Sequence, residues 1–135
     1  MRVAVISAPS RRRAPPDYVQ ALAKGMEKMG HRVEIIDAWT DDGMRLPGFD
    51  YLTIVTETVS LFSAKIPEII PKILSASSGI SGKKSAAFLK KGGLRSAKTL
   101  INVMEAMEKE GLVVNWSDIL LSAPHAEAIG KGIGA

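Results

Sequence analysis

The chain of 135 residues contains no cysteine, which excludes disulfides, thiolate nucleophiles and zinc or iron–sulfur sites built on Cys. It has only two histidines, His31 and His125, and they lie too far apart in the sequence to form a metal-ligand pattern. The Gly-x-Ser-x-Gly sequence of many hydrolases is also absent. We therefore expect neither a metal site nor a side chain that acts as a catalytic nucleophile.

Aromatic residues and long apolar runs are scarce as well. No apolar run approaches the roughly 18 residues needed to cross a bilayer, and the N-terminus begins with a predicted strand instead of a signal peptide. We expect a cytoplasmic protein with no membrane partner. The formal net charge is +4, but aromatic residues make up only 5% of the chain and no recognised nucleic-acid motif is present. Nucleic acid is therefore not an expected partner.

What the sequence does contain is typical of one globular domain spanning residues 1–135. Its N-terminal stretch predicts a buried strand over Val3–Ala8, then a basic loop, then a helix that starts near Pro15-Pro16-Asp17 and stops at Gly30. The free backbone N–H groups at the start of that helix are an anion site in principle. The alternative is an ordinary strand-to-helix turn without a ligand.

The rest of the chain continues to alternate strands with helices. We expect strands over 31–39, 51–56 and 83–89, and a fifth strand from 112–114 and 119–121 that is interrupted between them. Helices are expected over 66–74, bent by Pro71, over 96–110, capped by Ser96, and over 126–134, weakened by three glycines. This alternation predicts a parallel α/β sheet covered on both faces, with ligands at the carboxyl ends of its strands.

Four segments carry a resemblance to a known family: 3–7 with its loop and helix, 30–37, 49–56 running into 65–67, and 82–88. They resemble the flavodoxin-like family of FMN-binding flavodoxins and NAD(P)H-dependent FMN reductase-like proteins. The resemblance implies a three-layer α/β/α flavodoxin-like fold with a five-stranded parallel sheet of order 2-1-3-4-5. It also implies an FMN site at three loops, the first around the phosphate and the other two beside the isoalloxazine ring.

The resemblance assigns cofactor-binding positions to each of these loops. They are Ser7, Pro9, Ser10, Arg11, Arg12 and Arg13 in the first loop, Thr56, Thr58, Ser60 and Phe62 in the second, and Gly92 and Gly93 in the third. The first loop departs from the family pattern because it has no glycine and only two hydroxyls. Its arginines either replace those contacts by charge or form a solvated turn. Phe62 either stacks on the flavin or packs against the helix that follows.

Two functions follow as hypotheses. The first is an FMN-binding protein that transfers electrons, or reduces a substrate with NAD(P)H, with a flavin and either NAD(P)H or a redox protein as partners. The alternative is a flavodoxin-like domain that has lost FMN and binds another anion or a protein. A phospho-receiver domain would need acidic residues where Ser7 and Thr56 stand. Glu57 is interpreted either as a pocket carboxylate with a raised pKa or as an exposed or lysine-paired one, and the weak last helix favours a homodimer.

Overall fold

The computed structural model describes residues 1–133 of the protein. Its elements, in chain order, are β1 (Arg2–Ala8), α1 (Asp17–Lys28), β2 (Arg32–Asp37), the short 3-10 helix η1 (Leu46–Gly48), β3 (Tyr51–Glu57), α2 (Ile69–Ala76), β4 (Lys84–Lys90), α3 (Ser96–Lys109), β5 (Val113–Leu120) and α4 (Ala123–Gly130). All neighbouring strands pair in parallel, in the order β2-β1-β3-β4-β5. The predicted sheet and strand order are confirmed.

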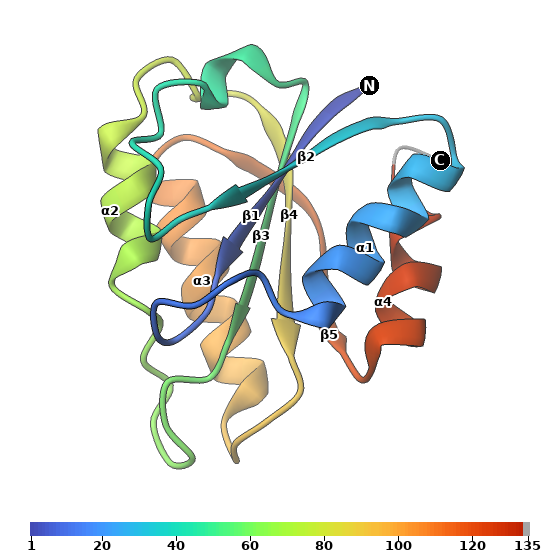
Figure 1. The fold of residues 1–135 in the computed structure, drawn as a ribbon. Coiled ribbons are helices and arrows are strands. Elements are labelled where there is room, and N and C mark those ends of the chain that lie inside the picture. The colour runs from blue at the N-terminus through green and yellow to red at the C-terminus, as the bar shows by residue number, and fades with distance from the viewer. Residues whose placement is uncertain (134–135) are drawn as a thin grey trace.

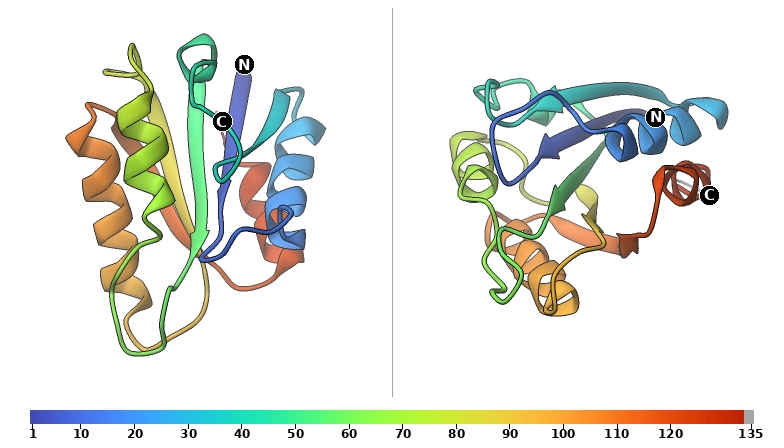
Figure 2. Two further views of the ribbon diagram at one scale, coloured as in Figure 1. Left: turned by 60° about the vertical axis from the view of Figure 1, so that its left-hand side comes forward. Right: turned by 60° about the horizontal axis from the view of Figure 1, so that its bottom comes forward.

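The sheet is the middle of three layers, as Figures 1 and 2 show. Helices α2 and α3 cover one face, while α1 and α4 cover the other. A hydrophobic core lies on each face of the sheet, and successive side chains of β1 point into one core and then the other. Ala4 and Ile6 belong to the core beneath α2 and α3, whereas Val3 and Val5 belong to the core beneath α1. Because both faces are buried, the central strands are almost continuously apolar, as the sequence suggested.

Helix α2 corrects one expectation about proline. The helix begins at Ile69, three residues after the predicted start, and Pro71 therefore lies in its first turn. The backbone N–H groups of a first turn have no partner within the helix, so a proline there removes no hydrogen bond and causes no bend. Pro71 is compatible with a regular helix.

Strand β5 is continuous, whereas the sequence predicted an interruption. Ser85 pairs with Val114 and Ala86 with Trp116, so the residue between them, Asn115, is bulged out of the register. The amide oxygen of Asn115 accepts a hydrogen bond of 2.5 Å from the hydroxyl of Tyr51, whose pKa burial raises to about 12. Trp116 is a packing residue, as predicted from the sequence, because its ring meets Phe88 edge-on at 5.8 Å.

Helix α4 begins at Ala123, where the hydroxyl of Ser122 accepts a hydrogen bond from the backbone N–H of His125. It therefore starts earlier than the predicted 126–134, and residue 134 lies outside the described residues. Gly25 and Gly130 let α4 cross α1 at close range, because a Cβ on Gly130 would lie 2.2 Å from the Leu22 carbonyl oxygen. The sheet face is thus covered, which removes the reasoning behind the homodimer; the homodimer itself stays a prediction.

Candidate functional site

The three predicted loops meet at one edge of the sheet. In the register, Ala8 at the end of β1 stands beside Thr56, and Glu57 at the end of β3 stands beside Lys90. Parallel strands end on the same edge, so the loops that follow β1, β3 and β4 are neighbours, as expected. This edge faces downward in Figure 1.

The carboxylate of Glu57 lies at the centre of this edge and accepts five hydrogen bonds. Oε2 receives the backbone N–H of Ser10 at 3.0 Å, the Ser10 hydroxyl at 2.6 Å and Nη1 of Arg13 at 2.8 Å. Oε1 receives Nη2 of Arg13 at 2.6 Å and the hydroxyl of Tyr18 at 2.9 Å. We call these donors, from Ser10, Arg13 and Tyr18, the anion cradle. The first loop is thereby fastened to the end of β3.

These contacts keep the carboxylate ionised. The Arg13 guanidinium, followed by the two Ser10 donors and the Tyr18 hydroxyl, outweighs burial and lowers the pKa of Glu57 to about 2. The same contact raises the pKa of Arg13, and burial together with the Glu57 charge raises that of Tyr18. Both sequence interpretations of Glu57 are wrong, because the side chain is only 18% exposed, pairs with arginine and has a lowered pKa.

The other residues predicted for the first loop have three different environments. Ser7 belongs to β1 instead of the loop, and its buried hydroxyl has no hydrogen-bond partner among residues 1–133. Pro9 contributes its carbonyl oxygen, which accepts a hydrogen bond of 3.0 Å from the Trp39 indole. Arg11 and Arg12 are exposed and make no ion pair within the described part of the chain. Of the three arginines, Arg13 is thus the one held by a defined contact.

The second and third loops contact each other directly. The backbone N–H of Leu94 donates to the Leu61 carbonyl at 2.9 Å. Gly93 has a φ of +72° and sits so close to this loop that a Cβ would lie 3.3 Å from the carbonyl oxygens of Ser60 and Leu61. A Cβ on Gly92 would lie 3.4 Å from the Thr58 hydroxyl oxygen. The predicted glycines therefore serve a close approach of two loops in this structure.

The remaining predicted positions of these loops are occupied differently. The buried Thr56 hydroxyl donates to the Ala8 carbonyl at 2.7 Å and so joins the ends of β3 and β1. The hydroxyl of Ser60 accepts the Ser63 N–H at 3.1 Å. Phe62 is 71% exposed, so the interpretation that it packs against the following helix is wrong. Ser96 is the first residue of α3, not its cap, and its hydroxyl donates to the Gly92 carbonyl.

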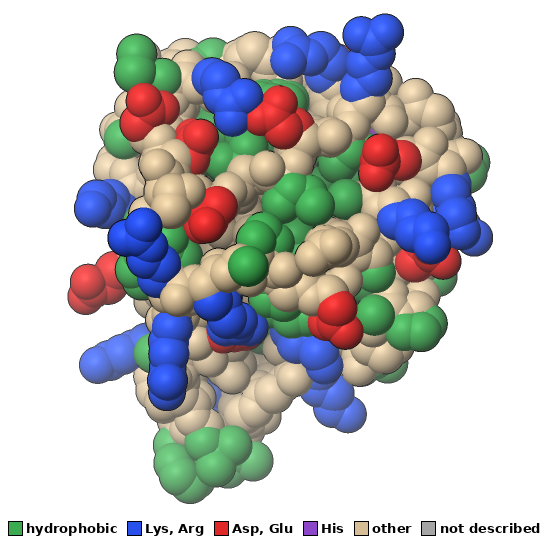
Figure 3. All heavy atoms as spheres, viewed as in Figure 1, with side chains coloured by type: hydrophobic (Ala, Val, Ile, Leu, Met, Phe, Trp, Pro, Cys, Tyr) green, Lys and Arg blue, Asp and Glu red, His purple; other side chains and the backbone are tan. Residues whose placement is uncertain are grey.

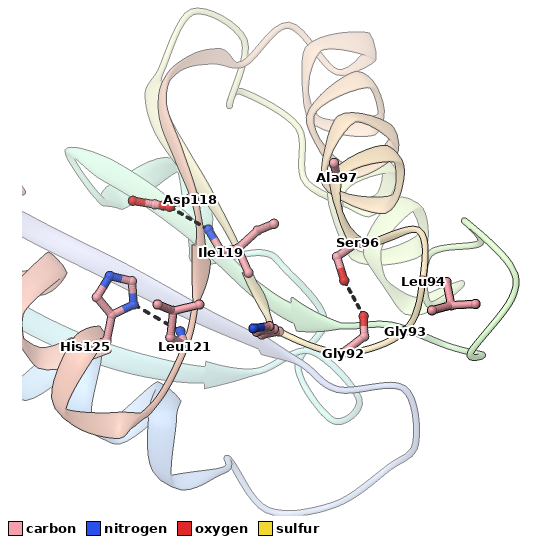
Figure 4. A pocket seen from close by; sticks show the side chains of 10 residues that line it. Gly92, Gly93, Leu94, Ser96, Ala97, Asp118, Ile119, Leu121 and His125 are labelled. Atoms are coloured by element: carbon pink, nitrogen blue, oxygen red, sulfur yellow. Dashed lines mark hydrogen bonds between the residues drawn. The ribbon is translucent and has the colours of Figure 1, made fainter.

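A pocket of about 730 Å³ opens on the other side of the third loop, between that loop and the end of β5 (Figure 4). Its lining comes from Lys91, Gly92, Gly93, Leu94, Ser96, Ala97, Asp118, Ile119, Leu121 and His125. Nδ1 of His125 accepts the Leu121 N–H at 3.0 Å, and Asp118 accepts its neighbour's N–H at 2.8 Å. Asp118 and His125 thus each make one hydrogen bond to a nearby backbone N–H at the end of β5.

Comparison with known proteins identifies the architecture but no close relative. No protein-family model and no curated protein matches the chain. Among solved structures, a flavodoxin from the domain Archaea has 17% identity and a TM-score of 0.71, covering 98% of this chain and 96% of its own. Two-electron reduced flavodoxin from Megasphaera elsdenii has 14% identity and a TM-score of 0.74, covering 96% of both chains. This chain has a flavodoxin-like fold.

A more distant flavodoxin-like neighbour is FerB, a flavoenzyme NAD(P)H:(acceptor) oxidoreductase from Paracoccus denitrificans, with 14% identity, a TM-score of 0.63, and coverage of 84% of this chain and 74% of its own. At such identities the likeness concerns the fold alone. None of the helices within residues 1–133 is long and apolar enough to span a membrane. The same residues contain no group of His, Asp or Glu side chains suited to a metal ion.

The residues of the flavodoxin-like fold's first loop do not fit an FMN phosphate in the arrangement seen here. The donors of the anion cradle are taken by Glu57, and Pro9, Pro15 and Pro16 have no backbone N–H to offer. The predicted roles of the loop residues in holding FMN stay predictions. Sequence reasoning missed Tyr18 as a partner and Glu57 as the occupant. The sequence did contain a signal: the carboxylate of Glu57 follows the predicted strand 51–56, and the arginines 11–13 follow the predicted strand 3–8, which the resemblance places next to it.

Proposed function

We propose that this chain is a flavodoxin-fold binding module that works without FMN. The observation that carries the proposal is the Glu57 carboxylate, which takes all five hydrogen bonds of the anion cradle. A phosphate in the first loop would need the same Ser10 and Arg13 donors. Since the pKa of Glu57 is about 2, the carboxylate stays charged at neutral pH and repels a second anion.

The contact between the second and third loops supports the same proposal. A planar ring held between these loops would have to break the hydrogen bond from Leu94 to Leu61 and move Gly93 away from the Ser60 carbonyl. The loops of this structure are therefore joined where the resemblance expects an isoalloxazine ring. With the ring position closed and the phosphate donors engaged, the carboxyl edge is suited to present an outer surface to a partner.

The second candidate is FMN-dependent electron transfer or NAD(P)H-linked reduction. It is favoured by the buried Ser7 hydroxyl, which lacks a partner among residues 1–133 and lies in β1 just before the first loop, and by the flavodoxins among the structural neighbours. In that case the flavin would supply the redox chemistry. The chain would have to release Glu57 from the cradle and separate Leu61 from Leu94 before it could hold the cofactor.

Titration with FMN and with riboflavin, followed by flavin fluorescence, distinguishes the two candidates. For the unmodified protein we expect no saturable binding of either flavin at micromolar concentrations. Saturable FMN binding by that protein would overturn the proposal in favour of the flavoprotein. The matched variant is Glu57→Ser, which removes the carboxylate and leaves the cradle donors free.

We expect Glu57→Ser to bind inorganic phosphate, measured by calorimetry, where the unmodified protein does not. The control is Glu105→Ser, which removes an exposed carboxylate on α3 and changes the net charge equally. If both variants gain phosphate affinity to the same extent, the effect is one of general charge and the cradle is not an anion site.

A further inference from the structure

An apolar patch forms the lowest point of the molecule in Figure 3, where Figure 1 places the loops that follow β3 and β4; three of the strongly exposed apolar side chains belong to these loops. They are Leu61, Phe62 and Leu94, exposed to 55%, 71% and 73%, and we call them the apolar cap. The loops that carry them are joined by the backbone hydrogen bond between Leu94 and Leu61. Although the sequence predicted no membrane partner, we propose that the apolar cap and the basic residues of the same sheet edge dock on the surface of an anionic lipid bilayer.

The positive charge of the chain is concentrated at the edge of the sheet that carries this cap. The segments 9–17, 57–68 and 90–98, which comprise the three loops and the adjoining ends of their strands and helices, contain eight Lys or Arg and three Asp or Glu, a net charge of +5. Because the whole chain has a net charge of +4, the rest of it carries −1. Arg13 is held by Glu57, while Lys65, Lys91 and Arg95 are exposed and have no ion pair within residues 1–133. These cations are free to meet anionic groups.

The shape of the cap favours a bilayer over a protein as the occupant. Figure 2 shows that the two loops project beyond the ends of the strands, so the cap is convex. Leu61 and Phe62 do not line the pocket beside the third loop, whereas Leu94 lies at its edge. A projecting cap of three side chains offers little area to a rigid protein surface. The interface of a bilayer adapts to such a shape, accepts the apolar groups and attracts the cations with its anionic lipids.

This inference goes beyond the proposed function, since it uses the outer surface of the loops and not the anion cradle. It is tested by flotation with vesicles of equimolar phosphatidylcholine and phosphatidylglycerol, and with vesicles of phosphatidylcholine alone. We expect binding to the anionic vesicles that weakens as salt is added, and little binding to the neutral ones. Absence of binding to anionic vesicles at low salt would overturn the proposal, whatever the FMN titration shows.

Matched variants separate the cap from general charge attraction. Lys91→Gln with Arg95→Gln should weaken partitioning by about 25-fold, at about fivefold for each charge. Arg32→Gln with Lys109→Gln removes two exposed charges from the opposite end of the sheet and should change it little. Phe62→Ser should weaken partitioning by about tenfold. Its control, Met44→Ser, alters a residue that is 76% exposed but lies outside the three loops.

Two further outcomes would also overturn the proposal. One is an equal loss of vesicle binding in the cap variants and in their controls, because the protein would then bind vesicles through general charge attraction and not through this surface. The other is binding of soluble poly-glutamate, lost in the Lys91 and Arg95 double variant, by a protein that does not bind vesicles. That result would assign the surface to an acidic protein.

Discussion

Replacing Glu57 by Gln removes the negative charge that the anion cradle holds, while the side chain keeps nearly the same shape. The cradle lowers the pKa of Glu57 from 4.5 to about 2, and a shift of that size corresponds to at most about 3 kcal/mol of stability at neutral pH. Arg13 is substantially exposed, so solvent screens its ion pair with Glu57, and the contribution of this pair to stability is smaller than that limit. We expect Glu57→Gln to lower the free energy of unfolding at pH 7 by roughly 1–2 kcal/mol.

The pH dependence gives this prediction its sharper form. A carboxyl group whose pKa is lower in the folded protein stabilises it above the unfolded pKa, near 4.5, and loses that contribution as the pH falls through the folded value, about 2. The difference in unfolding free energy between the unmodified protein and Glu57→Gln should therefore be constant from pH 7 to near pH 5 and then decrease as the solution becomes more acidic.

Urea unfolding followed by far-UV circular dichroism, repeated over this pH range, measures the difference. The control is Glu105→Gln, an exposed residue without an ion pair among residues 1–133, for which we expect no more than a few tenths of a kcal/mol. A difference for Glu57→Gln that stays the same down to pH 3 would refute the reasoning, since it could not come from the charge of the carboxylate.

Two predictions concern the packing of the domain. Gly130→Ala should lower the free energy of unfolding by about 1–3 kcal/mol, because the new Cβ would lie 2.2 Å from the Leu22 carbonyl oxygen. Thermal unfolding measures the effect, with the exposed Ala128→Ser as control; a melting temperature of Gly130→Ala equal to that of the unmodified protein would contradict the prediction. Thr53→Val should keep or raise stability, by up to about 1 kcal/mol, because the buried hydroxyl of Thr53 has no partner within the described residues; a clear loss in urea unfolding would reveal a hydrogen bond that the structure lacks.

The sheet could be predicted from sequence because its central strands leave few alternatives. Residues 3–8 and 51–56 are short, apolar and rich in β-branched side chains, and the structure places both in the middle of the sheet. The strand order came from the resemblance, since local patterns do not determine which strands become neighbours. Strand β5 was less predictable because it lies at an edge, where alternating exposure weakens its apolar pattern.

The last helix shows why composition alone misjudged one element. Glycine is unfavourable inside an isolated helix, so residues 126–134 were expected to be weakly helical. In the fold, Gly130 meets the backbone of α1, and the contact exists because no Cβ stands between the two helices. Intrinsic propensity was overridden by tertiary packing, whose partner at Gly25 lies more than a hundred residues earlier in the sequence.

The occupant of the candidate site could not be predicted because it depends on side-chain reach. The sequence indicated that the loops after β1 and β3 would be neighbours, and the resemblance left Arg13 either to hold a phosphate or to belong to a solvated turn. Arg13 and Glu57 could equally have faced solvent from the same edge. Their bidentate pairing requires the first loop to fold back over the end of β3, where Ser10 and Tyr18 add donors to the same carboxylate. That arrangement follows from three-dimensional geometry and from no local pattern.

The two obstacles to FMN act on different parts of the cofactor and are independent. Because Glu57 is attached to the end of β3, its carboxylate competes with phosphate at a high effective concentration, which a free ligand must exceed. If phosphate displaced the carboxylate, the negative charge of Glu57 would still lie beside the bound anion. The bond between Leu94 and Leu61 would instead oppose a ring held between the second and third loops, and it involves no charged side chain. Removing Glu57 therefore restores phosphate donors without opening the loops. Phosphate can then enter the cradle of Glu57→Ser even if the isoalloxazine ring remains excluded.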